Sequence, residues 1–332
     1  MKVFTHSGKF HTDEVVACML IELINGEIEI TRSRNLVNID QYDWVVDVGG
    51  IYDPFTNRFD HHQKDCNETW SPKYPILLSS SGMVFKHYWK EILEAFGFEN
   101  PTQKESDLVY SKIFLPIDAH DNGQETKEYY LALQKRDFSD GVQMGQVVSN
   151  MNADDVNSEK QNERFRYAMN YTFESICPMI SSIIKDYRNN TRIIEILKPL
   201  IAESRGVLVL PEGTWVNPYI LSQIDPQKKI YFTVYKKGEN WGFSAVQNKG
   251  FTNASRFKNR IDLIPYSTGS VKYADLIFIH KNLFCGEAKS LWTAEQVCQD
   301  SINEYKLRRN VKIGAGVVLG GGLLYILNKT FF

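Results

Sequence analysis

The stretch Asn57-Arg58-Phe59-Asp60-His61-His62-Gln63 places two histidines and a carboxylate directly after a short run that ends in Phe59. It holds two of the seven histidines of the chain. Side chains at the carboxyl ends of parallel strands meet at one edge of a sheet, where α/β proteins bind their ligands. We therefore expect this stretch to mark the ligand-binding edge of a parallel sheet.

Strands and helices alternate through the first 150 residues. One predicted strand ends at Phe4, and two others cover Glu27–Thr31 and Trp44–Val48. The predicted helices cover about 13–24, 81–96 and 104–116. This alternation predicts an α/β fold with a mainly parallel sheet in the first domain.

The second half of the chain has a different pattern. A long helical stretch over 158–187, broken or kinked at Pro178, reads as a connector. The strands expected after it are Val207–Leu210, Lys229–Lys236, Gly242–Val246 and Leu276–His280. We predict a catalytic domain over 1–150, a helical connector over 151–200, a smaller β-rich α/β domain over 201–310 and an apolar tail over 311–332.

The tail contains an uncharged run from Ile313 to Leu327, preceded by four basic residues. A membrane-spanning helix needs about 20 apolar residues, and this run reaches that length only if Lys329 snorkels and Phe331-Phe332 are counted. Its glycines suit close helix packing in lipid, so we favour a membrane anchor formed by residues 313–332 over a buried terminal segment.

Charge is distributed unevenly along the chain. Residues 1–199 carry 21 Lys and Arg against 30 Asp and Glu, and residues 200–332 carry 17 against 10. An acidic half suits divalent cations, and a basic half suits a phosphate-bearing substrate. The five cysteines form no CxxC pair, which favours a reducing, intracellular setting over a disulfide framework or a zinc ribbon.

Several potential metal ligands follow predicted strands or a predicted helix. They are His6, His11, Asp13, Asp47, Asp60, His61, His62, Asp118 and Asp121. Mixed imidazole and carboxylate ligands suit Mn²⁺, Fe²⁺, Zn²⁺ or Mg²⁺ rather than a thiolate site. Adjacent residues of an extended chain point apart, so we expect one of His61 and His62 to bind metal and the other to face the substrate.

Five motifs in order carry a resemblance to a known family. They are Thr5–Glu14, Val46–Gly50, Phe59–Gln63, Ser79–Gly82 and Asp118–Gly123. The combination closely resembles the MYG-type exonuclease family, a relative of the DHH phosphoesterase superfamily. The resemblance is specific over about residues 1–150 and looser to about 290, and it implies a DHH-like first domain.

This resemblance implies a two-metal phosphodiesterase site that contains two divalent cations, with Mn²⁺ favoured over Mg²⁺ or another transition metal. Asp47 would bridge the ions and take part in catalysis. His6 and His11 would hold one ion, and Asp13, His61 and Asp118 the other. His62 would contact the scissile phosphate and Asp60 would orient the histidines. Asp121 remains an alternative to Asp118.

The same resemblance implies substrate contacts. The residues concerned are Ser80, Ser81, Arg256, Arg260 and Lys289. In the segment Phe284–Lys289, Glu287 stands where the family has a second glycine. A carboxylate there would repel a phosphate unless it points away.

Three functions are compatible with these features. The leading one is a 3′-to-5′ exonuclease acting on RNA or short oligonucleotides through a metal-activated water, in the nucleus or mitochondrion by family resemblance. The second is a phosphohydrolase of pyrophosphate or of cyclic or short dinucleotides, which the near-neutral pI of 6.4 allows. The third is a catalytically silent, membrane-tethered nucleic-acid-binding protein. The sequence is compatible with homo-oligomers.

Overall fold

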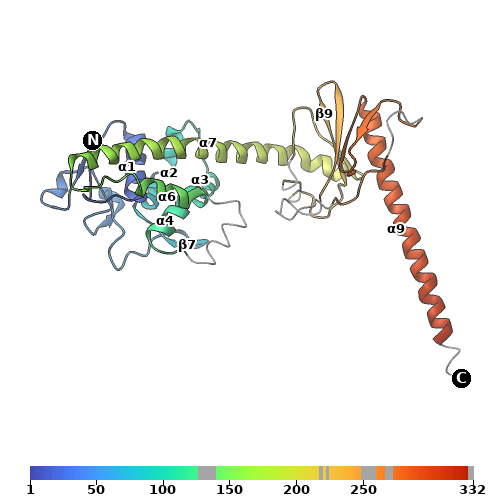
Figure 1. Ribbon diagram of the computed structural model, residues 1–332, viewed down its shortest axis with the longest axis horizontal. Helices are drawn as coiled ribbons and strands as arrows, with labels where there is room; N and C mark the ends of the chain where they lie inside the picture. Colours follow the sequence, from blue (N-terminus) through green and yellow to red (C-terminus); the bar gives the residue numbers. More distant parts are fainter. Residues whose placement is uncertain (126–139, 217–219, 222–223, 248–258, 266–271, 328–332) are drawn as a thin grey trace. The chain divides into compact units, whose positions relative to one another are not determined.

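The computed structural model describes residues 1–125, 140–216, 220–221, 224–247, 259–265 and 272–327, with the backbone alone described for 140–143 and 311–327. The chain divides into two compact units, unit 1 (Met1–Tyr187) and unit 2 (Arg188–Phe332) (Figure 1). The four-part division expected from the sequence remains a prediction.

Unit 1 contains a five-stranded sheet in the order β2-β1-β3-β5-β4. Its strands are β1 (Lys2–Thr5), β2 (Glu29–Arg32), β3 (Trp44–Val46), β4 (Tyr52–Asp53) and β5 (Arg58–Phe59), and a separate hairpin pairs β6 (Thr69–Ser71) with β7 (Tyr74–Leu77). Only β4 runs antiparallel to its neighbour, so the prediction of a mainly parallel sheet is confirmed. The carboxyl ends of β1, β3 and β5 therefore lie side by side at one edge.

Unit 1 also contains helices. They are α1 (Thr12–Asn25), α2 (Ser80–Ala95), α3 (Gln103–Val109), α4 (Leu115–Asp121), α6 (Asp140–Ser149) and the first part of α7 (Glu159–Glu203), with short turns η1 (Ile39–Gln41), η2 (Pro54–Thr56) and the π-helical turn η3 (Tyr110–Phe114). The helix expected over 104–116 is thus three successive segments that end only at Asp121. Asp118 and Asp121 lie within a helix, and the prediction that they follow one was wrong.

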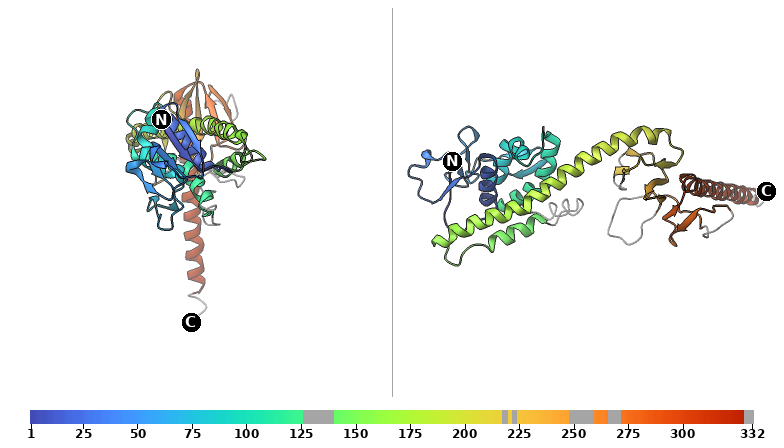
Figure 2. Two further views of the ribbon diagram at one scale, coloured as in Figure 1. Left: turned by 90° about the vertical axis from the view of Figure 1, so that its left-hand side faces the viewer. Right: turned by 90° about the horizontal axis from the view of Figure 1, so that it is seen from above.

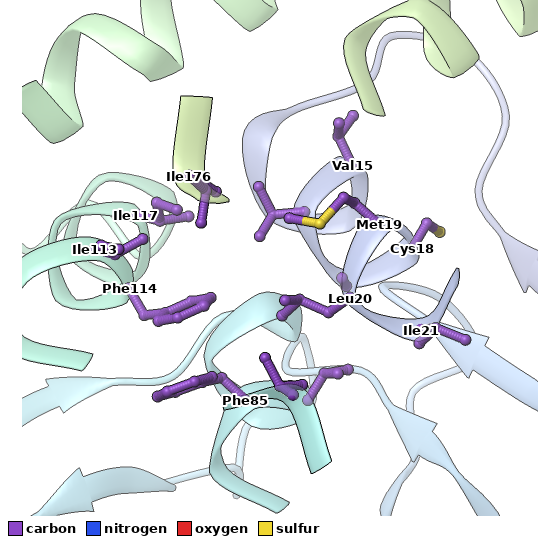
Figure 3. Close-up of a cluster of buried hydrophobic side chains, with 14 of the residues drawn as sticks. Val15, Cys18, Met19, Leu20, Ile21, Phe85, Ile113, Phe114, Ile117 and Ile176 are labelled. Atoms are coloured by element: carbon purple, nitrogen blue, oxygen red, sulfur yellow. The ribbon is translucent and has the colours of Figure 1, made fainter. Parts of the chain in front are cut away.

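Apolar side chains from these helices pack tightly together (Figure 3). Leu20 and Cys18 of α1 are completely buried in this core. The rings of Phe85 on α2 and Phe114 stack with their centroids 4.1 Å apart. This packing fixes α1, α2 and α4, which carry Asp13, Glu14, Ser80, Ser81, Asp118 and Asp121.

Helix α7 is one unbroken helix from Glu159 to Glu203 and runs through Pro178 without the expected break (Figures 1 and 2). Ile176 and Ile180 of α7 pack into the core of unit 1. Leu197 and Ile201, beyond the unit boundary, pack in a core of unit 2. The segment read as a connector therefore contributes buried side chains to both units.

Unit 2 contains a sheet in the order β11-β12-β10-β9-β8. Its elements are β8 (Val207–Val209), β9 (Phe232–Lys237), β10 (Asn240–Ala245), β11 (Leu276–Ile279), β12 (Cys285–Ala288) and α9 (Leu291–Leu327). Among the described strands of this sheet, only β8 and β9 pair in parallel. Cys298 and Ile302 of α9 are buried in a further core of unit 2, separate from the one that contains Leu197 and Ile201. A β-rich α/β unit therefore forms as predicted.

No helix in the described part of the chain is long and apolar enough to cross a membrane. The backbone of α9 continues helically to Leu327. The side chains of the predicted tail, residues 311–332, lie outside the described residues.

Candidate metal centre

The ends of three neighbouring strands bring the candidate ligands together. His6 follows β1, Asp47 follows β3 and His61 follows β5. Helix α1 begins directly after His11 and presents Asp13 and Glu14 from its first turn. Because β1, β3 and β5 are adjacent and parallel, these side chains converge as the sequence predicted.

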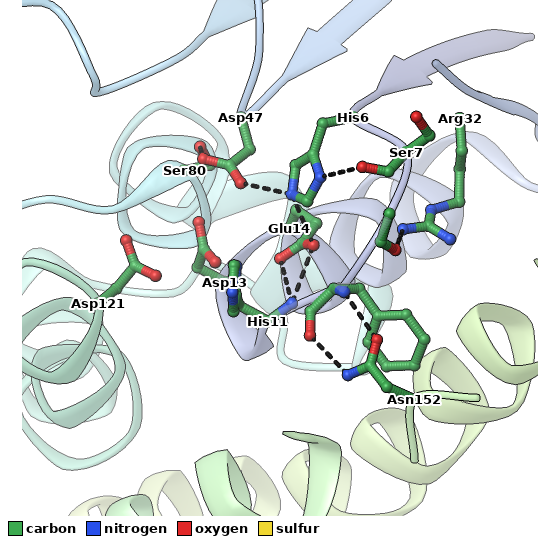
Figure 4. A network of polar contacts seen from close by, with 12 residues as sticks. His6, Ser7, His11, Asp13, Glu14, Arg32, Asp47, Ser80, Asp121 and Asn152 are labelled. Atoms are coloured by element: carbon green, nitrogen blue, oxygen red, sulfur yellow. Dashed lines mark hydrogen bonds and ion pairs between the residues drawn. The ribbon is translucent and has the colours of Figure 1, made fainter. Parts of the chain in front are cut away.

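The ligand atoms form three overlapping sets, in each of which all atoms lie within 4.8 Å of one another. The sets are His6, His11, Glu14 and Asp47; Asp47, His61 and His62; and His11, Asp13 and Asp121. Asp47 belongs to two sets and His11 to two. Figure 4 shows the members His6, His11, Asp13, Glu14, Asp47 and Asp121. The expected division of ligands between two ions remains a prediction: Asp13 forms a set with His11 and Asp121, and its Oδ2 also lies 4.0 Å from Nε2 of His61.

Asp47 lies between two histidines. Its Oδ2 is 3.2 Å from Nε2 of His6, and its Oδ1 is 3.3 Å from Nε2 of His61. Ser80 donates a hydrogen bond of 3.2 Å to Oδ1. Burial alone would raise the pKa of the Asp47 carboxyl, but the contacts with His6 and His61 hold it below its ordinary range.

The backbone at Asp47 has an unusual conformation. Its φ is +58°, and Gly49 and Gly50 follow with φ of +100° and +70°. Aspartate is one of the few residues that tolerate this left-handed region. The turn redirects the chain at the end of β3 and leaves the carboxylate at the edge of the sheet.

In the absence of a cation, the imidazoles of His6 and His61 have strongly raised pKa values and so favour the protonated form. Burial lowers the pKa of each imidazole, but neighbouring carboxylates outweigh it and raise each pKa to about 10. The carboxylates are Asp47 and Glu14 for His6, and Asp121 and Asp47 for His61. Nδ1 of His6 lies 3.1 Å from the Ser7 carbonyl, which favours a proton on Nδ1 and leaves Nε2 facing the acids.

Asp13 provides the test of whether these residues fit a cation. Its side chain is buried, yet neither carboxylate oxygen has a hydrogen-bond partner. Burial raises the pKa of this carboxyl well above its ordinary value, and Asp47 and Asp121 add to the effect. A buried carboxylate without a partner is unfavourable. The oxygen and imidazole donors around it suit a divalent transition metal or Mg²⁺.

Asp60 and His62 form a pair beside the cluster. Oδ1 of Asp60 accepts hydrogen bonds from the backbone N–H of His62 at 3.1 Å and from its Nδ1 at 2.8 Å, and Oδ2 accepts from the Gly50 N–H. These contacts raise the pKa of His62. The geometry agrees with the expected orienting role of Asp60, although His62 also lies within ligand distance of Asp47.

Asp118 lies apart from the three ligand sets. Its carboxylate is fully buried and accepts hydrogen bonds from Ser79 N–H, Ser79 Oγ and Tyr110 Oη at 3.0, 2.7 and 2.9 Å. A Cβ on Gly82 would lie 2.4 Å from both carboxylate oxygens. Asp118 thus joins α4 to the start of α2. Asp121, the alternative to Asp118, groups instead with His11 and Asp13 and contacts His61 Nε2 at 3.0 Å.

Ser80 and Ser81 are fully buried at the start of α2. Ser80 donates to Asp47, and the Ser81 hydroxyl lies 3.1 Å from that of Ser79. This burial argues against the substrate contacts expected for both residues, because their hydroxyls already hydrogen-bond within the protein. They support the carboxylates instead.

Glu14 is a member of the cluster that sequence reasoning missed. Its buried carboxylate lies 2.9 Å from His6 Nε2 and accepts two hydrogen bonds from the His11 backbone N–H. The spacing of His11 and Glu14 is that of a helix cap and its third helical residue. That spacing was the available signal, because a capping glutamate at this helix start faces the loop that carries His6.

The residues of unit 2 that were predicted to contact the substrate differ in their exposure to solvent. Arg256 lies outside the described residues. Arg260 is buried and pairs with Asp225, so it is not available to a phosphate. Lys289 is exposed. Glu287 contacts Lys237 at 2.6 Å and Asn240 at 2.7 Å, which neutralises the carboxylate that would repel a phosphate.

A cavity of about 290 Å³ opens beside the ligand cluster. It is lined by the candidate ligands His11, Asp13, Asp47, His62 and Asp121, and also by Thr12, Ile117, His120, Gly145 and Ser149. The volume is close to the lower limit of small-molecule sites. Candidate ligands and substrate space are therefore contiguous.

Solved structures offer only a distant likeness. RecJ in complex with Mn²⁺ from Thermus thermophilus aligns with 92% of this chain and 52% of its own, at 11% identity and a TM-score of 0.28. A TM-score this low does not establish a shared fold.

Relatives in sequence are nearer. The MYG1 protein YER156C of Saccharomyces cerevisiae is 27% identical over 319 residues, covering 87% of this chain and 92% of that protein. The MYG1 protein C694.04c of Schizosaccharomyces pombe is 35% identical over 171 residues, covering 49% and 51%. The MYG1 exonuclease of Mus musculus is 36% identical over 133 residues, covering 37% and 35%. The chain thus spans about half the length of the fission-yeast relative that it matches.

A family model covers most of the chain. Residues 2–302 match the model of the MYG1 exonuclease family, described as the uncharacterised protein family UPF0160. The five motifs and the ligand cluster all fall within these residues. The resemblance inferred from the motifs is confirmed, and the chain belongs to the MYG1 exonuclease family.

Proposed function

We propose that this chain is a divalent-metal-dependent phosphodiesterase that removes nucleotides from the 3′ end of RNA or short oligonucleotides. The observation that carries the proposal is the buried carboxylate of Asp13. Neither of its oxygens has a hydrogen-bond partner, although Oδ2 lies 4.0 Å from Nε2 of His61, and the carboxylate lies among His11 and Asp121 at the wall of a cavity. The printed name of the mouse relative, an exonuclease, supports the same class of reaction.

The side chains around the cavity have distinct tasks in this proposal. Cations held by the members of the three ligand sets other than His62 would lower the pKa of a water molecule and withdraw charge from the phosphoryl oxygens. His62 lines the cavity with a side chain that is 63% exposed, and Asp60 fixes its Nδ1. Nε2 of His62 is therefore directed away from Asp60, and we assign it to a non-bridging oxygen of the scissile phosphate.

The choice of RNA and of the 3′ end rests on the family resemblance, and the size of the cavity supports action at an end. About 290 Å³ suits a single nucleotide rather than a duplex. The same size also favours a second candidate, a phosphohydrolase of pyrophosphate or a short dinucleotide. Comparing 5-mer RNA, 30-mer RNA and pyrophosphate separates the two, since strong preference for pyrophosphate would exclude the exonuclease.

The direct test uses end-labelled RNA and DNA with EDTA-treated protein to which Mn²⁺ or Mg²⁺ is returned. Products that shorten one nucleotide at a time from the 3′ end are expected, together with loss of activity in Asp47→Asn. Asparagine tolerates the left-handed backbone at position 47, so this variant removes charge without adding strain. The matched control is Asp40→Asn, at an exposed position.

Retained activity in Asp47→Asn would exclude the assigned site. Absence of bound metal in millimolar Mn²⁺ would favour a catalytically silent binding protein. For location we propose the nucleus or mitochondrion, with residues 313–332 as a membrane anchor. Imaging of the tagged full chain tests the compartment, and flotation with liposomes before and after removal of residues 313–332 tests the anchor.

A further inference from the structure

His120 is a third histidine of the cavity and belongs to none of the ligand sets found among the described residues. It lies on α4 directly before Asp121. Its side chain is 54% exposed, so it is accessible to a bound molecule. The proposed hydrolysis assigns no task to it.

Glu125 lies beside the imidazole of His120. Nδ1 lies 3.3 Å from Oε1 of Glu125, a close contact without hydrogen-bond geometry. A carboxylate oxygen facing Nδ1 favours the tautomer that carries its proton there, which leaves a lone pair on Nε2. The opposite edge of the ring, Cδ2 and Nε2, faces Gly145 on α6.

Gly145 leaves that edge of the ring uncovered. A Cβ at this position would lie 3.5 Å from Cδ2 and 3.6 Å from Nε2 of His120, and 3.7 Å from Oγ1 of Thr12. These are ordinary contact distances, so packing does not require glycine here. Glycine within a helix is about 1 kcal/mol less favourable than alanine. A less stable residue therefore occupies a position where its absent side chain opens cavity space beside Nε2.

We propose that His120 is a specificity-determining residue that accepts a hydrogen bond from the 2′-hydroxyl of the nucleotide held in the cavity. An imidazole nitrogen with a lone pair accepts a hydrogen bond, and a ribose hydroxyl can donate one whereas phosphate oxygens are acceptors. The 2′-hydroxyl is also the group by which a protein distinguishes RNA from DNA. The inference rests on the proposed phosphodiesterase and names how its substrate class is recognised.

The test compares three 5′-labelled 5-mers of one sequence: all-RNA, 2′-deoxy at the 3′-terminal nucleotide, and 2′-deoxy at the next nucleotide. We expect kcat/KM of the wild-type protein to fall about 5–10-fold for one of the two deoxy substrates, as for one lost hydrogen bond. His120→Phe and Gly145→Ala should each lower the rate on RNA and bring the RNA-to-deoxy ratio close to 1. Val147→Ala, at a residue of α6 that does not line the cavity, should keep the wild-type ratio.

The Mn²⁺-induced rise in melting temperature, measured for every variant, shows whether the metal centre is intact. An equal fall on ribo and deoxy substrates in His120→Phe would overturn the inference, as would a wild-type ratio of 1. Binding of AMP and dAMP in Mn²⁺ provides an assay without hydrolysis. If no oligonucleotide is cut but His120→Phe abolishes a preference for AMP, the proposed function fails and the inference stands. Equal binding of AMP and dAMP by the wild-type protein overturns the inference.

Discussion

Nε2 of His61 lies 3.0 Å from Oδ2 of Asp121, although one residue follows a strand and the other ends a helix. This contact places α4 against the edge of the sheet. It also separates Asp121 from Asp118, which lies one turn earlier and hydrogen-bonds within the protein.

The first prediction uses this separation. Asp121→Asn should weaken Mn²⁺ binding at least 100-fold, more than the 10–100-fold typical of losing an outer-shell partner. Asp118→Asn should keep the metal affinity but lower the free energy of unfolding by about 1–3 kcal/mol, because the Tyr110 hydroxyl or the Ser79 donors lose an acceptor. Calorimetric titration and urea unfolding measure the two effects. The opposite assignment would follow if Asp118→Asn lost the metal and kept its stability.

The second prediction concerns Asp13. In metal-free protein at pH 8, Asp13→Asn should raise the free energy of unfolding by about 1–3 kcal/mol, because it removes a buried carboxyl that has no hydrogen-bond partner. Mn²⁺ at 100 times its Kd should stabilise the wild-type protein by about 2.7 kcal/mol and the variant far less. Denaturant unfolding with and without metal checks both signs. A metal-free variant less stable than the wild type would contradict this account of Asp13.

The third prediction is a pH dependence. The pKa of His6 and of His61 is about 10 without a cation, against an ordinary 6.5, so both rings are protonated at pH 8. A metal requires the neutral ring, so binding should release up to two protons and tighten by up to 100-fold per pH unit. Titration calorimetry in buffers of different ionisation enthalpy counts the protons. Affinity independent of pH between 7 and 9 would rule out His6 and His61 as ligands.

The same pKa values predict the stability of the metal-free protein. A histidine whose folded pKa is raised contributes stability that is present below pH 6.5 and is lost as the pH rises through about 10. Metal-free protein should therefore lose stability between pH 6.5 and 10. Thermal unfolding at several pH values measures this loss, and the metal-loaded protein should not show it.

The fourth prediction concerns Arg260. Arg260→Gln should destabilise unit 2 by about 3 kcal/mol, because it leaves the buried carboxylate of Asp225 without its cation. This value is at the low end of such effects, since Asp225 still accepts from the N–H groups of Lys229 and Ile230. Lys289→Gln, at an exposed position, serves as the control for stability. Unchanged unfolding in Arg260→Gln with weaker RNA binding would restore Arg260 as a substrate residue.

The sequence predicted the ligands that follow strands better than those on helices. Three neighbouring parallel strands end at one edge, so His6, Asp47 and His61 had to converge once the strands were recognised. Asp118 and Asp121 could not be separated, because the predicted helix ended before both. Their difference arises from helical rotation, which turns one toward Ser79 and the other toward His61.

Two other features could not be predicted from the sequence, because each depends on a contact between residues that are separated along the chain. Glu14 reads as a helix cap, and only its distance to His6 shows that it joins the cluster. Arg260 reads as a phosphate ligand until Asp225 is found beside it. Propensity and spacing carry no information on such partners, since they depend on how the sheets and helices pack.

Cys18 and Cys298 are completely buried, one in the core of unit 1 and one in that of unit 2. Burial raises the pKa of both thiols, and only a thiolate reacts readily with an alkylating reagent. The other three cysteines are at least partly accessible and can be replaced by serine. Each unit would then carry a single buried cysteine, whose rate of alkylation reports how often that unit opens. Metal binding should slow the alkylation of Cys18 in unit 1 before that of Cys298 in unit 2.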